Sequence, residues 1–121
     1  MRDALKPLIW MGSSRKDLKA LPGTVQDMFG YALYLAQAGG RHVDAKPLKG
    51  FHGAGVLEVV GSFAGNAYRA VYTVRFEDAV YVLHAFQKKS KSGIATPKED
   101  LEIVKRRLSD AQALSRKETG K

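Results

Sequence analysis

The chain has 121 residues, and its 20 lysines and arginines outnumber its 12 aspartates and glutamates to give a net charge of +8. This length predicts a single domain spanning residues 1–121. The absence of cysteine excludes disulfides and thiolate metal sites and favours a reducing cytoplasm. No stretch approaches the ~20 apolar residues of a membrane helix, and no secretory signal opens the chain, so we expect no membrane partner. An excess of positive charge is common in proteins that bind phosphate backbones or acidic proteins, although a merely soluble basic domain would share it.

The first third of the chain predicts a strand and two helices. Residues 5–11 are apolar enough for a strand, at an edge because of Pro7. A short helix is predicted from Ser14 to about Ala20. A second helix opens at Thr24, and its apolar stripe consists of Val25, Met28, Phe29, Ala32, Leu35 and Ala36. We expect these helices to form a hairpin with one buried face.

From about residue 46 the hydrophobic period changes from helical to alternating. Strands are predicted over residues 56–60, 67–76 and 80–86, with turns at 61–66 and 77–78. Successive hairpins make an antiparallel sheet of three or four strands. We expect the helices to cover one face of it.

The last predicted element is a helix with a clear start. Thr96 stands at the N-cap, Pro97 at the first helical position and Glu99 at the third, which is the pattern of a capping box. Residues 115–121 are expected to form a frayed, flexible tail. The predicted fold class is therefore α+β, in the order strand, two helices, antiparallel sheet, helix.

Arg69 is a candidate functional residue because alternation places it on a central strand, on the face shared with Arg75 and opposite to Tyr72. An arginine there costs rotamer entropy and desolvation unless an anion meets it. Glu58 across the hairpin would make a structural ion pair. A scissile phosphate is the alternative, because a guanidinium can hold it with two hydrogen bonds.

Two basic segments add further candidates. Lys88, Lys89 and Lys91 follow the last predicted strand, where a rigid sheet edge could hold them against a phosphate, although a solvated loop would have the same composition. Lys46, Lys49 and His52 lie in a glycine-rich loop before the sheet. His84 alternates with apolar neighbours, so we expect a core or half-buried histidine.

The sequence shows no nucleophile paired with a base, no carboxylate pair, no phosphate-binding P-loop and no metal-ligand spacing, so we expect neither a metal nor a cofactor. What remains is chemistry performed by cations on a phosphodiester. This points to RNA, whose own 2′-hydroxyl can act as the nucleophile while the protein positions it and neutralises charge.

Four segments in this order resemble the RelE/ParE superfamily of type II toxin–antitoxin toxins: Leu48-Lys49-Gly50, residues 55–59, residues 68–72 and residues 84–89. Within it, the chain is similar to the phage-derived HigB-like and Tad-like branch, which has a Tyr-Arg-x-x-Tyr strand and a Phe-x-Lys-Lys strand end. The resemblance runs from about Lys6 to Leu108. It implies a small RelE-like (microRNase) fold and ribosome-dependent cleavage of mRNA. It also implies inhibition by a helix-turn-helix antitoxin, with operator DNA bound only through the antitoxin complex.

Carried over by position, the resemblance implies that Arg69 stabilises the pentavalent phosphate. Lys88 or Lys89 would neutralise charge or protonate the leaving oxygen, and Lys49 would contact the RNA backbone. We expect the other RNA-binding residues to be Lys46, His52, Arg75 and Lys91.

The first strand of the sheet departs from the ribonuclease pattern. Other members carry basic residues there, where this chain has Glu58, Val59 and Val60. The general base is therefore open between Glu58, His52 and a lysine of lowered pKa. There are two alternatives to a ribonuclease. One is a non-catalytic toxin that binds a protein target, and the other is a degenerate basic module that binds only the antitoxin. The missing basic positions favour the degenerate module.

Overall fold

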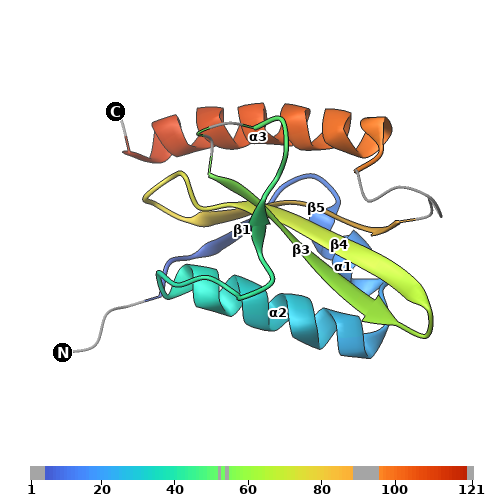
Figure 1. Cartoon of the computed structure of the whole chain (residues 1–121). Coiled ribbons are helices and arrows are strands. Elements are labelled where there is room, and N and C mark those ends of the chain that lie inside the picture. The colour runs from blue at the N-terminus through green and yellow to red at the C-terminus, as the bar shows by residue number, and fades with distance from the viewer. Residues whose placement is uncertain (1–4, 52, 54, 89–95, 120–121) are drawn as a thin grey trace.

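The computed structural model describes residues 5–51, 53, 55–88 and 96–119, and within them a five-stranded sheet forms the middle layer (Figure 1). Its order is β1-β5-β4-β3-β2. The strands are β1 (Leu8–Trp10), β2 (Lys46–Pro47), β3 (Val56–Phe63), β4 (Asn66–Thr73) and β5 (Val80–Lys88). Strands β3, β4 and β5 form the predicted antiparallel meander. The sheet is mixed, because β1 pairs with β5 in parallel.

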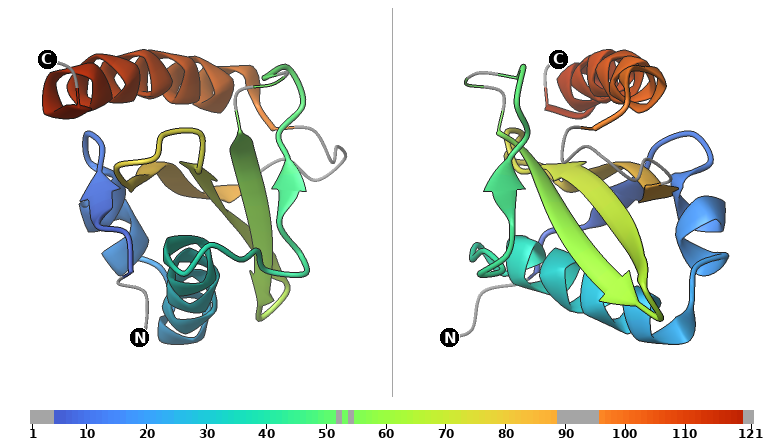
Figure 2. Two further views of the ribbon diagram at one scale, coloured as in Figure 1. Left: turned by 90° about the vertical axis from the view of Figure 1, so that its left-hand side faces the viewer. Right: turned by 45° about the vertical axis from the view of Figure 1, so that its right-hand side comes forward.

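Helices cover both faces of this sheet. Helices α1 (Ser14–Lys19) and α2 (Gly23–Gln37) lie on one side and α3 (Lys98–Thr119) on the other, so the α+β fold has three layers (Figures 1 and 2). The expectation that helices cover only one face is wrong. Residues 68–73 and 80–85 are buried at every position, so the central strands present apolar side chains to both sides.

Two hydrophobic clusters fill the spaces between the layers. The cluster under α2 confirms most of the predicted stripe, with Leu33 buried and Leu35 only half-buried. Its largest fully buried members are Tyr72 and Phe29. The cluster under α3 contains Leu48, Val56, Val71, Ala79, Tyr81, Leu83, Val104 and Ala111. The two faces of β4 therefore separate Tyr72 from Arg69 as predicted.

A β-bulge in β5 changes which side chains face α3. Val71 pairs with His84, but the next residue, Tyr72, pairs with Val82. Leu83 is the extra residue, and it turns toward α3 as His84 does. The bulge therefore places a polar ring and an apolar side chain side by side under the helix.

The β3–β4 hairpin is longer and tighter than predicted. Phe63 pairs with Asn66, and the two turn residues Ala64 and Gly65 both have positive φ angles, 53° and 82°. This is the type I′ geometry that suits the twist of a two-residue hairpin. At its other end β4 stops at Thr73, three residues earlier than predicted, because the Thr73 hydroxyl accepts the Arg75 backbone N–H and turns the chain.

Both ends of α3 differ from the prediction. The helix begins at Lys98, and the Thr96 hydroxyl donates to Glu58 in place of the expected capping role. At the other end, the residues expected to fray from Ser115 continue the helix to Thr119. The Ser115 hydroxyl is buried and donates to Asp78 at 2.8 Å, which fixes this end to the sheet.

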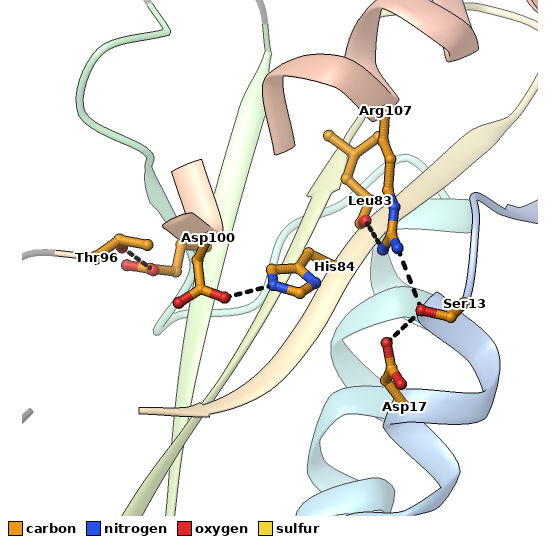
Figure 3. A network of polar contacts seen from close by, with 8 residues as sticks. Ser13, Asp17, Leu83, His84, Thr96, Asp100 and Arg107 are labelled. Carbon is orange, nitrogen blue, oxygen red and sulfur yellow. Dashed lines mark hydrogen bonds and ion pairs between the residues drawn. The ribbon is translucent and has the colours of Figure 1, made fainter. Parts of the chain in front are cut away.

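A polar network joins the middle of α3 to α1. The Arg107 guanidinium donates to the Leu83 carbonyl at 2.9 Å and to the Ser13 hydroxyl at 3.2 Å, and Ser13 donates to Asp17 (Figure 3). Burial lowers the pKa of Arg107, and the Asp17 carboxylate acts in the opposite direction.

In the described part of the chain, none of the helices is long and apolar enough to cross a bilayer.

Candidate active site on the sheet

Glu58 and Arg69 form an ion pair on the face of the sheet that α3 covers. Arg69 Nη1 donates to Glu58 Oε1 at 2.7 Å, and the two side chains are 9% and 13% exposed. The Thr96 hydroxyl donates to the other carboxylate oxygen, also at 2.7 Å. The Glu58 carboxylate is therefore oriented from two sides, by β4 and by the segment that leads into α3.

Lys88 lies at the end of β5, on the same face as Arg69. It pairs with Ala67 and is 8% exposed. Burial lowers the pKa of its ammonium group from the ordinary value of 10.5, Arg69 lowers it further, and Glu58 acts in the opposite direction. Lys88 is two residues beyond Phe86, the residue of β5 that pairs with Arg69, so the register places the two cations on the same face of adjacent strands. Three residues singled out in the sequence thus converge from three adjacent strands.

His84 lies next to this group, under the first turn of α3. Its Nε2 is 2.7 Å from Asp100 Oδ1 (Figure 3), and its ring stacks on Phe86 with centroids 4.6 Å apart. Phe86 in turn pairs with Arg69 across the strands. The prediction of a buried histidine is confirmed. Its Nδ1 is also buried, with no hydrogen-bond partner among the described residues.

Thr96 and Asp100 are the site residues that the sequence did not reveal. A threonine before a helix and an acid in its first turn have ordinary local explanations, as a cap and as a partner of the helix dipole. No periodicity indicates that their side chains reach β3 and β5. Their contacts depend on where α3 crosses the sheet.

A groove of about 1220 Å³ lies at the β2 edge, and its lining includes Glu58 and Thr96. It is lined by two of the predicted RNA-binding residues, Lys46 and Lys49. Lys6 and Arg41, which the sequence did not single out, add two more cations from the other side of the edge. The groove therefore brings positive charge to the candidate active site.

Several predicted residues are not part of this group. Arg75 is exposed beyond the end of β4, with its guanidinium 5.7 Å from the centre of the Phe76 ring. The stretch of β4 from Arg69 to Thr73 alone spans roughly 13 Å, and Arg75 lies beyond the turn that follows. His52, Lys89 and Lys91 lie outside the described residues. Among the described residues, no three His, Asp or Glu side chains gather as a metal site would require.

The model of the phage-derived Gp49-like family (DUF891) matches residues 16–109, which is more than half of the chain. The chain belongs to this family. Gp49-like proteins are RelE-like toxins of toxin–antitoxin systems. No curated protein matches the chain. The matched span of this Gp49-like protein contains Glu58, Arg69 and Lys88.

Proposed function

We propose that this Gp49-like protein is the toxin of a type II toxin–antitoxin system and acts as an endoribonuclease on mRNA at the ribosome, in the manner of HigB-like toxins. The observation that supports this is the placement of Glu58, Arg69 and Lys88 on one face of three adjacent strands, with Glu58 and Arg69 in hydrogen-bond contact. A carboxylate, a guanidinium and an ammonium group of lowered pKa can supply the general base, the charge stabilisation and the general acid of phosphodiester transesterification.

In the proposed reaction, Glu58 takes the proton of the ribose 2′-hydroxyl. The 2′-oxygen attacks the adjacent phosphorus, the bond to the 5′-oxygen breaks, and a 2′,3′-cyclic phosphate remains. Lys88 gives a proton to the departing 5′-oxygen, for which its lowered pKa is suited. Arg69 stabilises the charge on the phosphate, since a guanidinium with five N–H donors can orient Glu58 and contact a phosphate oxygen together.

The partners in this proposal follow from charge and family. The +8 net charge favours binding to the RNA-rich ribosome. A helix-turn-helix antitoxin would neutralise the toxin in the cytoplasm, and operator DNA would be bound only through their complex. The 2′-hydroxyl requirement predicts that RNA is cleaved and DNA is not.

A second candidate function is a non-catalytic module of the same fold that binds an antitoxin or another protein target. The Glu58–Arg69 pair favours it, because a nearly buried ion pair is also what a purely structural arginine would form. In that case the two residues stabilise the sheet and perform no chemistry.

One experiment separates these functions. Four chains are each induced in a bacterium that lacks the antitoxin: the unaltered chain, Glu58→Gln, Arg69→Ala and the control Arg106→Ala, which removes an exposed guanidinium of α3. New 5′ ends are then mapped across all mRNAs. We expect new ends only in translated regions for the unaltered chain and for Arg106→Ala, and none for the other two. Growth arrest without new ends would favour a protein target. Absence of both arrest and new ends would favour the non-catalytic module.

A further inference from the structure

The groove at the β2 edge combines an apolar wall with exposed lysines. This composition suits an occupant that has a flat, neutral part and carries anionic groups beside it. Leu48, Phe51 and Leu101 form an apolar wall on the α3 side of the edge. Lys46 and Lys49 are exposed at the rim. Phe51 and Leu101 are only half-buried, so part of each side chain remains available to an occupant.

Two glycines lie in the loop that carries Phe51. Gly50 and Gly53 have φ angles of 95° and 70°, in the left-handed region that favours glycine. A β-carbon at either position would meet no atom of the described residues within 4 Å. The backbone beside Phe51 therefore borders open space, and an occupant can approach it closely.

The position of Glu58 limits what the occupant can be. Glu58 and Thr96 belong both to the groove and to the candidate active site. The Glu58 carboxylate offers no positive charge to the acidic side chains of a peptide, whereas its oxygens can accept further hydrogen bonds from the amino or imino groups of a nucleobase. Lysines at the rim suit the phosphates on either side of such a base.

We propose that the groove binds one unpaired nucleobase of the RNA, stacked on Phe51, and so places the neighbouring phosphate at Arg69 and Lys88. This inference rests on the proposed function and adds its substrate requirement, which is a single-stranded RNA whose base can leave its stack. Single-stranded RNA is commonly recognised by such stacking on aromatic side chains.

The test compares a short fluorescent single-stranded RNA with the same RNA lacking one base, by anisotropy at low salt. Every ribose of both RNAs carries a 2′-fluoro group in place of the 2′-hydroxyl, so that the proposed cleavage cannot affect the readout. We expect Phe51→Ala to weaken binding of the intact RNA by roughly 5- to 150-fold, the range for loss of one base–aromatic stack. Removal of the base should weaken binding to the unaltered chain and have little effect on Phe51→Ala.

Two further variants make the result specific. Phe63→Ala removes an exposed ring at the far end of β3, outside the groove, and should bind both RNAs as the unaltered chain does. Phe51→Leu keeps apolar packing but removes the flat ring, and replaces Phe51→Ala if circular dichroism shows that alanine unfolds the chain.

Equal binding of the intact and base-deleted RNA by the unaltered chain would overturn the inference, as would the absence of binding to either. Displacement of the RNA by an acidic peptide that contacts Phe51, without any base dependence, would indicate a protein occupant and overturn it too. Base-dependent binding without new mRNA ends in the cell would leave the groove as an RNA site and remove the proposed cleavage. The two proposals can therefore fail separately.

Discussion

Arg69 donates a hydrogen bond to Glu58 at 2.7 Å, from one strand of the β3–β4 hairpin to the other. The same contact serves two roles. It holds a carboxylate and a guanidinium on a nearly buried face, where each alone would carry a desolvation cost. In the proposed reaction it would also keep the base and the anion-binding group at a fixed separation, as catalysis on a phosphodiester requires.

Arg69→Ala is expected to lower the free energy of unfolding by about 1–3 kcal/mol, because it leaves a nearly buried oxygen of Glu58 without its charged donor. Arg75→Ala is the matched control, since it makes the same change on an exposed side chain and should alter stability by no more than about 0.5 kcal/mol. Urea unfolding measures both. Equal losses would show that the Glu58–Arg69 contact contributes nothing to stability.

The free energy of unfolding of the unaltered chain, measured relative to that of Lys88→Met, is expected to rise as the pH is raised toward 10.5. The folded protein holds the pKa of Lys88 below 10.5, so the unfolded chain binds this proton more tightly. The free-energy cost of burying the charged ammonium is fully present at a pH below the pKa of Lys88 in the folded protein. It is lost as the pH rises from that value to the ordinary pKa of 10.5. Urea unfolding of both chains, from neutral pH to pH 10.5, gives the difference.

Lys105→Met, on the exposed side of α3, corrects for the effect of methionine itself. A difference between the Lys88 variant and the unaltered chain that stays constant with pH would contradict a perturbed lysine at this position.

Gly12→Ala is expected to destabilise the chain more than Gly39→Ala does. Both glycines have positive φ, 53° and 90°, which costs an L-residue about 1–2 kcal/mol. Only at Gly12 does a β-carbon also meet another group, Arg107 Nε at 2.5 Å, whereas the space beside Gly39 is open. The additional cost should disappear in an Arg107→Ala background, which a double-mutant cycle of unfolding free energies would measure. If it persists there, the steric explanation fails.

Ser115→Ala is expected to lower the free energy of unfolding by about 1 kcal/mol relative to Ser109→Ala. Both changes replace serine by alanine in α3, so helix propensity cancels. Only Ser115 is buried and donates to Asp78, which also accepts the Tyr81 hydroxyl at 2.7 Å. Thermal or urea unfolding of the two variants is the measurement. Identical stabilities would support the frayed tail that the sequence suggested.

Much of the candidate site was open to prediction because strands alternate. The alternation placed Arg69 opposite to Tyr72 on β4, and the hairpin made Glu58 the anion within reach. The contact of Thr96 with Glu58 and that of His84 with Asp100 were not predictable, because both depend on how α3 crosses the sheet.

The sequence by itself determined the order of the elements, the buried stripe of α2 and the two faces of β4, since hydrophobic periodicity is a local property of the chain. Only the tertiary structure decided that β1 joins β5 in parallel, that helices cover both faces, and that a bulge turns Leu83 and His84 toward α3. These features depend on pairing between segments far apart in the chain. Register, strand order and helix placement are selected by total burial, which no local window of sequence contains.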